Sequence, residues 1–452
     1  MIRRVSPALA LLVLVLAMAR TCAAATLMSD STTVDRWTLP NGLQVLTRHV
    51  PRAGSLSCAL GFRTGSDADP AKSPGTAELL AELEFTAPAG EIPERTRDQM
   101  ESLRPNGWTL RVDPRSTVLM EAASATQFPG VLHQLAVRLR GVTVNAAALD
   151  HARAMVRHSL GDHYFGSPAS LLWWQARAYA RGLSQADIVQ LASGRSLDGV
   201  GVRDAQQALQ AAFSPSNAVL SVVGDLSAWD VRRIIEQEFG AVPAGPAPPP
   251  LPVHPLGSAA VTLPRPDVSG PIGVVAVLAP ALSDTLYPSY FLAMLMISQH
   301  TADKWGPALP PLTTRFSYPV LDDPTMARFY PKLDANQKDL QALGEEFANT
   351  QDELAGMIVT AGAEQAVINS AQWLLGGPMP LQLVDRIRTD PAALNEVCVD
   401  DALRGLLGSD SFWAEFRERL NPMRVPGPSN WNDYVSDPTH LARVLLVPGG
   451  RR

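Results

Sequence analysis

The sequence predicts an α+β protein made of two similar α/β sandwich domains. Short apolar strands alternate with helices, a proline-rich stretch divides the chain, and the same order of elements returns after it. A length of 452 residues, of which 46% are hydrophobic, suits about two to four domains with buried cores. We therefore expect two domains, residues 26–240 and 265–452, joined by a linker at residues 241–264.

The N-terminus has the order of a secretory signal peptide. Arg3 and Arg4 precede an apolar run over residues 8–19, and small residues follow up to Ala25. Because this run is shorter than the roughly 20 residues that cross a bilayer, we expect cleavage after Ala25 and no transmembrane anchor. Cys22 would suit a lipoprotein, but the two residues before it do not fit a lipid-attachment signal. The expected product is exported, periplasmic and soluble.

Charge and cysteine content exclude other classes. The formal net charge is −6 and becomes more negative once residues 1–25 are removed, so no nucleic-acid partner is expected. Only Cys58 and Cys398 remain after processing, and their wide separation gives no disulfide framework. We expect both to be buried apolar residues, and a bridge between them stays open as an alternative.

Period and composition place the elements of the first half. Alternating or apolar runs predict strands, and longer runs with a helical pattern predict helices. The expected strands are Ser55–Phe62, Ser116–Ser124 and Ala218–Val223, and the expected helices are Thr76–Phe85, Ala147–Leu160 and Ala228–Phe239. The first half is therefore expected to be α+β.

A proline-rich stretch separates the two halves. Residues 240–264 hold eight prolines, which cannot sustain a helix or a central strand. Beyond it we expect the strands Ile272–Leu278 and Leu441–Val447 and the helices Tyr287–Ile297 and Gln337–Asn349. The segments SNAVLSVVGD and HLARVLLVPG each close a half with an apolar strand and a turn, which favours a duplicated plan.

Three segments of the first half resemble the insulinase, pitrilysin and mitochondrial-processing-peptidase family of zinc metallopeptidases. They are TLPNGLQVLTRHVP (Thr38–Pro51), GFRTGSDADPAKSPGTAELLAELEF (Gly61–Phe85) and FSPSNAVLSVVGD (Phe213–Asp225). The resemblance covers residues 35–240 by these segments, and the rest of the chain by length and repeated plan. It implies two bowl-shaped domains that enclose a peptide-sized chamber.

The zinc-binding motif of this family is absent from the sequence. Active relatives carry His-x-x-Glu-His on the helix after Gly75, with two zinc ligands on one face and a glutamate that takes a proton from the metal-bound water. The ligand positions here are Glu78 and Glu82, and the base position is Ala81, whose methyl group cannot accept a proton. His158 or the following Ser159 stands where the resemblance places a downstream glutamate ligand.

Two readings of the replaced positions remain open. Glu78 and Glu82 lie four residues apart on one helix face, and with His158 they would form a site for one divalent metal such as Zn. The alternative, which we favour, is that Glu78, Glu82 and Glu84 form a solvated face, with no catalytic residue and no cofactor.

Contacts with a substrate are also predicted from the resemblance. Active relatives hold the substrate carbonyl with an arginine and a tyrosine in the second half, within a sequence run that is absent here. Arg315 and Tyr318 are candidates for a displaced pair, and the alternative is that they are structural residues of a strand-like segment. An extended peptide would pair with an edge strand at Trp108–Met120, although Pro114 removes one hydrogen-bond donor from it.

The chain keeps the expected scaffold of the family but lacks its zinc-binding motif, which gives three functional hypotheses. The first is a non-catalytic subunit in a heterodimer with a catalytic insulinase-family peptidase. The second is a stand-alone envelope protein that binds extended peptides. The third is a metallopeptidase with the unusual ligands Glu78, Glu82 and His158. Gly-x-Ser-x-Gly, Cys-x-x-Cys and phosphate-loop motifs are all absent, which excludes the corresponding enzyme classes.

Overall fold

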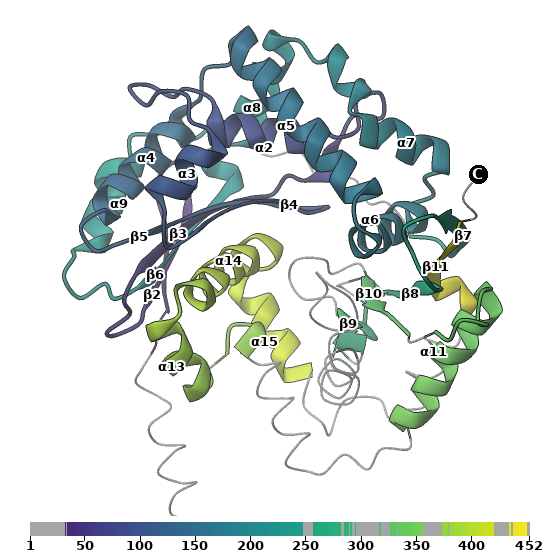
Figure 1. Ribbon diagram of the computed structural model, residues 1–452. Helices are drawn as coiled ribbons and strands as arrows, with labels where there is room; N and C mark the ends of the chain where they lie inside the picture. The colour runs from purple at the N-terminus through teal and green to yellow at the C-terminus, as the bar shows by residue number, and fades with distance from the viewer. Residues whose placement is uncertain are drawn as a thin grey trace, which may run out of the picture.

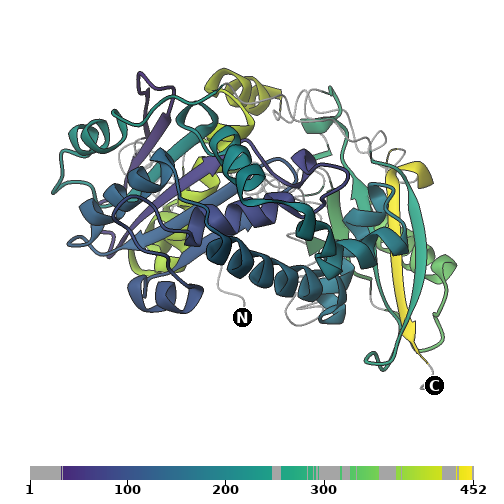
Figure 2. The same cartoon turned by 90° about the horizontal axis from the view of Figure 1, so that it is seen from above.

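The fold consists of two mixed β-sheets and the helices that cover them, which confirms the predicted α+β class (Figure 1). Seen from above, the sheets stand at opposite ends of the molecule (Figure 2). The computed structural model describes residue 32 and residues 34–246, 256–281, 284–288, 290–291, 294, 316–317, 326–331, 333–355, 373–377, 379–419, 434 and 437–449. Among these residues, every helix is too short or too polar to cross a membrane.

The first sheet has the strand order β1-β2-β6-β3-β5-β4. Its strands are β1 (Val34–Thr38), β2 (Gln44–His49), β3 (Leu56–Phe62), β4 (Trp108–Val112), β5 (Thr117–Ala123) and β6 (Ala218–Gly224). β2 and β6 are parallel, and the other neighbours are antiparallel. Every residue of β3, β5 and β6 is buried, because helices cover both faces of the sheet.

Helices of the first half form a layer over one face of this sheet (Figure 1). They are α2 (Thr76–Thr86), α3 (Arg97–Leu103), α4 (Phe128–Arg140), α5 (Ala146–Phe165), α7 (Gln185–Ser193), α8 (Val202–Ala212) and α9 (Val231–Phe239). Their apolar faces and the sheet form one large core. α2 lies inside this layer, since it contacts both α5 and β4.

The second sheet has the order β7-β11-β8-β10-β9. Its strands are β7 (Ala259–Arg265), β8 (Ile272–Leu278), β9 (Phe316–Ser317), β10 (Met326–Phe329) and β11 (Leu441–Pro448), with α11 (Leu340–Ala355) packed on β8 and β11. The remaining helices of the second half include α13 (Leu381–Thr389), α14 (Pro391–Leu407) and α15 (Asp410–Arg419).

Each half lends one helix to the sheet of the other. α6 (Pro168–Ala180), from the first half, packs against β8 and β11, whereas α14 packs against β3, β5 and β6 on the face opposite α2 (Figure 1). α14 is fixed there by a buried ion cluster: Arg48 donates two hydrogen bonds of 2.8 and 2.9 Å to Asp401, which also accepts from Arg404. The two halves therefore interlock.

Most expected strands of the sequence are confirmed. The predicted strands at residues 55–62, 116–124, 218–223, 272–278 and 441–447 agree with the structure to within one residue at each end, and α2 agrees equally well. α5 is longer than expected and runs through Gly161 to Phe165. The expected helix at residues 287–297 and the signal peptide lie wholly or partly outside the described residues.

Two expectations about proline are wrong. The linker was expected to run to residue 264, but β7 begins at Ala259 and contains Pro264, which is tolerated because β7 is the edge strand. The expected single edge strand Trp108–Met120 is a hairpin of β4 and β5, with Pro114 in its turn. Pro114 therefore interrupts no strand.

Cys58 and Cys398 are both buried and unpaired. Cys58 belongs to the core under the helical layer, whereas Cys398 belongs to the core around α14 and donates to the Ser57 carbonyl at 3.3 Å. Burial raises the pKa of the Cys58 thiol well above its usual range. The expectation of two buried apolar cysteines is confirmed.

Candidate functional site

The helix that bears the former motif starts at a glycine turn. Gly75, before α2, has a φ of 90°, a left-handed conformation that favours glycine. The Asp69 carboxylate accepts hydrogen bonds of 2.7 Å from the backbone N–H groups of Gly75 and Ala77, which caps the first turn. This cap fixes the register in which Glu78, Ala81 and Glu82 enter the interior.

Ala81 stands at the base position and is completely buried within the core. It brings no proton acceptor to the site, as the sequence indicated.

Glu82 is held by an arginine. Its side chain is 1% exposed, and its Oε2 atom lies 2.6 Å from Nη2 of Arg97, the first residue of α3. The Thr96–Gln99 capping box starts α3 and so sets the position of Arg97. The Arg97 guanidinium therefore pairs with Oε2 of Glu82, the residue at the second ligand position. The other carboxylate oxygen of Glu82, Oε1, is buried without a hydrogen bond.

Glu78 lies one turn before Glu82 on the same helix face and is half-buried. Its Oε2 atom is buried without a hydrogen bond. Burial raises the pKa of Glu78 above its usual value, and a backbone hydrogen bond and the charges of Arg177 and Arg181 oppose this rise. Arg177 comes from α6, and its guanidinium lies 4.6 Å from the ring centre of Trp174.

α5 contributes Ser159 and His163. The His163 ring stacks on Trp174, with ring centres 4.2 Å apart, and its Nε2 atom lies 3.5 Å from Oγ of Ser159. Burial, assisted by the charge of Arg177, lowers the pKa of His163 to about 4. The imidazole is therefore neutral at pH 7 and too weak a base to activate the serine. Its Nδ1 atom is buried without a hydrogen bond.

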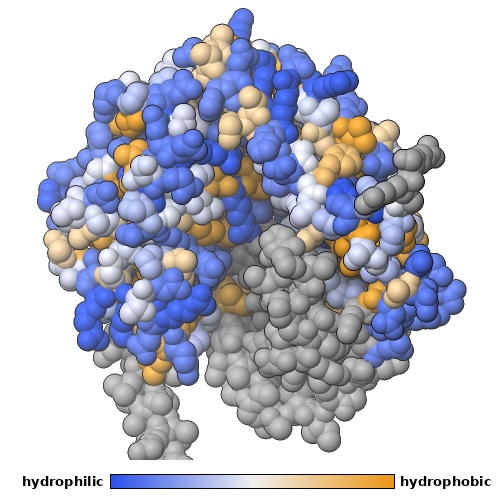
Figure 3. All heavy atoms as spheres, viewed as in Figure 1, coloured by the Kyte–Doolittle hydropathy of each residue, from blue (hydrophilic) through white to orange (hydrophobic). Residues whose placement is uncertain are grey.

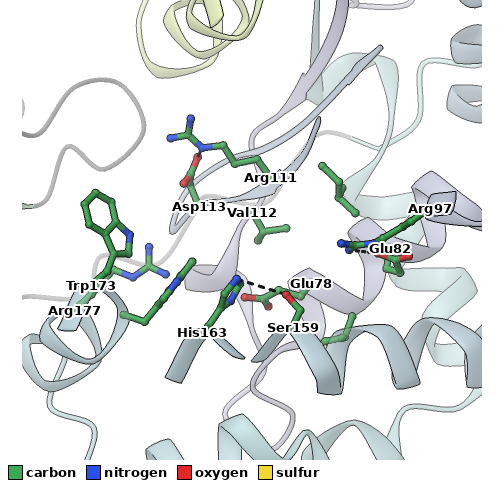
Figure 4. Close-up of a pocket in the computed structure, with 13 residues that line it drawn as sticks. Glu78, Glu82, Arg97, Arg111, Val112, Asp113, Ser159, His163, Trp173 and Arg177 are labelled. Atoms are coloured by element: carbon green, nitrogen blue, oxygen red, sulfur yellow. Dashed lines mark hydrogen bonds and ion pairs between the residues drawn. The ribbon is translucent and has the colours of Figure 1, made fainter. Parts of the chain in front are cut away.

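These side chains line one cavity of about 330 Å³ between α2, α5, α6 and β4 (Figure 4). The lining residues are Glu78, Glu82, Arg97, Leu110, Arg111, Val112, Asp113, Val156, Ser159, His163, Trp173, Trp174 and Arg177. In the space-filling view, the face shown has a hollow near its centre between described residues, and the surface around this hollow is mainly polar (Figure 3). The cavity is polar, aromatic and mixed in charge.

The structure does not assemble the ligand trio of Glu78, Glu82 and His158. His158 points away from the cavity: its side chain is 76% exposed, and its Nε2 atom lies 3.4 Å from a carboxylate oxygen of Asp162, one turn along α5. Val156, Ser159 and His163 are the residues of α5 that reach the cavity. Within the described ranges, no group of three or more His, Cys, Asp or Glu side chains is arranged to hold a metal ion. The donors present therefore do not fit zinc.

The expectation of a solvated carboxylate face is also wrong. Glu82 and Glu84 are 0% and 2% exposed, because α2 lies inside the helical layer and its polar side chains meet arginines from other elements. Burial raises the pKa of Glu84 to about 8, against the opposing charges of Arg138 and Arg95. These buried partners lie far from α2 in the sequence and could not be read from the motif.

Two further pairs of residues bear on the site, one predicted from the sequence and one found in the structure. Arg315 and Tyr318 lie outside the described residues, so their role stays a prediction. Trp173 and Trp174 form one wall of the cavity. Their adjacency in the sequence was the available signal.

Sequence comparisons relate part of the chain to one family. Residues 200–303 match the family described as "Peptidase M16 inactive domain". The probable mitochondrial-processing peptidase subunit beta of Schizosaccharomyces pombe is 23% identical over 297 residues, which are 62% of this chain and 62% of that protein. Because of this similarity we refer to the chain as the M16 homologue. The M16 homologue carries no His-x-x-Glu-His sequence, and Ala81 stands at the base position.

Solved structures agree in fold. A protease from Helicobacter pylori superposes with a TM-score of 0.68 at 13% identity, over 92% of this chain and 100% of that one. The periplasmic protease PqqL from Escherichia coli gives a TM-score of 0.63 at 14% identity, over 92% of this chain and 47% of that one. The M16 homologue thus has the M16 fold in both halves. It spans less than two thirds of the S. pombe relative and about half of PqqL.

Proposed function

We propose that this M16 homologue is a non-catalytic protein that binds an extended peptide along β4. The observation that carries the proposal is the open edge of β4 beside the cavity: β4 ends the first sheet, and among the described residues no strand pairs with its outer side. Such an edge can add a peptide as one more strand, which needs main-chain hydrogen bonds and side-chain pockets but no metal.

The register of the β4–β5 hairpin determines which groups face outward. Ala122 N–H donates to the Gly107 carbonyl, and Asp113 N–H donates to the Ser116 carbonyl. Because hydrogen-bonded positions alternate in an antiparallel pair, the odd-numbered residues of β4 bond to β5. The N–H and C=O groups of Trp108, Leu110 and Val112 therefore point to the open edge.

Packing on both sides holds this edge in place. Trp108 stacks on Phe85 of α2, with ring centres 4.9 Å apart. On the other side, Asn395 of α14 donates a hydrogen bond of 2.8 Å to the carbonyl of Asn106 in the turn before β4. The edge is preorganised, so little ordering entropy is lost when a peptide binds.

A proline substitution tests the proposal. Leu110→Pro removes the outward N–H of Leu110 and leaves the hydrogen bonds to β5 intact, whereas Leu110→Ala keeps the N–H and shortens the side chain. We expect unstructured peptides to bind the wild type and Leu110→Ala, and to bind Leu110→Pro at least about tenfold more weakly in calorimetric titration. Equal binding by both variants, with both folded, would reject pairing along β4.

A second proposal is that the protein acts as the partner of a catalytic M16 subunit. It is supported by the relative from S. pombe, which is named as a subunit of a processing peptidase. Affinity purification of the tagged protein from its native host should recover a homologue that carries His-x-x-Glu-His. Recovery of the protein alone, at its monomer mass, would reject this assembly.

We also propose an exported, periplasmic location. The order of charged, apolar and small residues before Ala25 supports it, as does the similarity to a periplasmic protease. N-terminal sequencing of the mature protein should begin at Thr26, and a product that retains Met1 in the cytoplasmic fraction would contradict export.

A further inference from the structure

The cavity beside β4 carries buried polar atoms that its own residues leave unpaired. Oε2 of Glu78 and Oε1 of Glu82 are both buried acceptors with no hydrogen bond, one turn apart on the same face of α2. A buried carboxylate oxygen without a donor is costly, and such atoms are rare in folded proteins. Glu78 and Glu82 both line the same cavity, and the residues that line it are shown together in Figure 4.

We propose that the cavity receives the cationic side chain, lysine or arginine, of the bound peptide, with Glu78 and Glu82 as its acceptors. This inference rests on the proposed binding of a peptide along β4. An ammonium or guanidinium group carries several donors and one positive charge, which matches two adjacent carboxylates that each lack a donor.

The arginines of the cavity do not favour an anion instead. Arg97 is paired with Glu82 at 2.6 Å, and Nε of Arg111 lies 2.8 Å from a carboxylate oxygen of Asp113. Arg177 lies against the ring of Trp174 and beside Glu78. An incoming anion would have to compete with these carboxylates, whereas a cation meets oxygens that are already without a donor.

The position of the cavity suits a side chain of a peptide on β4. Leu110 and Val112, whose main-chain groups face the open edge, belong to both the strand and the lining of the cavity. A side chain that leaves the added strand toward α2 would therefore enter the cavity beside Glu78. Nε of Arg97 is a buried donor without a partner there, and it is available to a carbonyl oxygen.

Peptides that differ at one position test this inference on the unaltered full chain. The probes are short, unstructured peptides of serine, threonine and valine, acetylated and amidated at their ends, with lysine, arginine, norleucine or glutamate at the centre. We expect the lysine and arginine peptides to bind about tenfold more tightly than the norleucine peptide, since a hydrogen bond to a charged group stabilises by about that factor. The glutamate peptide should bind most weakly.

The outcomes separate the inference from the function on which it rests. If norleucine or glutamate binds as tightly as lysine, the cationic pocket is rejected and binding along β4 stands. If no peptide binds, both proposals fall. Glu78→Gln should reduce lysine binding to the level of norleucine and leave norleucine unaffected, whereas Glu101→Gln, at an exposed position of α3, should keep the preference. A preference that survives in folded Glu78→Gln and Glu82→Gln would overturn the assignment of the acceptors.

Discussion

Two sets of buried carboxylates lie on opposite faces of the first sheet and differ in how completely they are paired. On the α14 face, both oxygens of Asp401 accept hydrogen bonds, from Arg48 and from Arg404. On the α2 face, Glu82 has one oxygen paired with Arg97 and one oxygen unpaired, and Oε2 of Glu78 is unpaired. Both sets contain arginine, so they differ in whether every carboxylate oxygen accepts a hydrogen bond.

This difference separates a cluster that serves the fold from one that can still bind. The charges of Arg48 and Arg404 lower the pKa of Asp401 far below its usual range, in spite of its burial, so it stays ionised. For Glu78, burial outweighs the neighbouring arginines and raises the pKa. A saturated cluster has no capacity for a ligand, whereas a partly paired one beside a cavity retains it at some cost in stability.

Removing Asp401 should have the largest effect on stability. Asp401→Ala leaves Arg48 and Arg404 buried without their acceptor, so we expect the free energy of unfolding to fall by about 3–5 kcal/mol. Urea denaturation followed by circular dichroism measures this loss. Asp385→Ala, at an exposed residue of α13 that pairs with Arg388, is the matched control and should cost about 0–1 kcal/mol. Similar losses in the two variants would show that the cluster does not hold α14.

Removing Glu82 should cost less than removing Asp401. Glu82→Ala breaks one ion pair, but the Arg97 side chain is 35% exposed and can be solvated by water. We expect a loss of about 1–3 kcal/mol in the same urea titration. Glu82→Gln, which preserves the volume and one acceptor for Arg97, should recover part of it. A loss as large as that of Asp401→Ala would mean that Glu82 is as fully committed to the fold as Asp401.

Neutralising Glu78 should leave stability unchanged or raise it by up to about 1 kcal/mol at neutral pH, because it removes a buried charge with an unpaired oxygen. The direction in which stability changes with pH follows from the raised pKa of Glu78. A carboxyl whose folded pKa lies above its unfolded pKa binds its proton more tightly when folded, so its contribution is lost as pH rises between the two values.

Glu78→Gln should therefore flatten the decline in stability as the pH rises above the unfolded pKa of a glutamate. Glu84, whose pKa burial raises to about 8, contributes in the same direction, and Glu84→Gln should flatten the decline further. Thermal unfolding of the wild type and both variants across this range measures the effect. An unchanged slope in both variants would contradict the raised pKa values.

The sequence predicted the scaffold better than the site for a physical reason. β8 was predicted with its observed bounds because an apolar run is a local signal, and the loss of the motif at Glu78, Ala81 and Glu82 was readable from spacing alone. The partners of these residues depend on contacts between distant segments: Arg97 and Arg177 come from α3 and α6. Their pairing with α2 could not be predicted from local patterns.

α14, on the opposite face of the first sheet, is a second case in which local patterns did not predict the tertiary contacts. Its charged residues Asp401 and Arg404 are typical of a solvated helix face, yet both are buried, at 1% and 0% exposure. They are buried because the helix crosses to the sheet of the other half and meets Arg48 there. Only the tertiary fold brings that partner, 353 residues away in the chain, to the helix.

A third set of charges, at the surface, should give the smallest effect. His133 on α4 bridges Glu238 at 2.8 Å and Glu91 at 2.9 Å, but its side chain is 48% exposed. The hydrogen bonds to Glu238 and Glu91 raise the pKa of His133, so its stabilising contribution is complete below the unfolded pKa and is lost as pH rises through the folded pKa. Because solvent screens the pair, His133→Gln should lower the melting temperature by no more than about one degree at pH 5.5 and not at all at about pH 8.5. A shift of several degrees at the lower pH would show that a fully paired histidine stabilises the fold even in contact with water. The number of paired atoms would then matter more than burial in the two interior clusters.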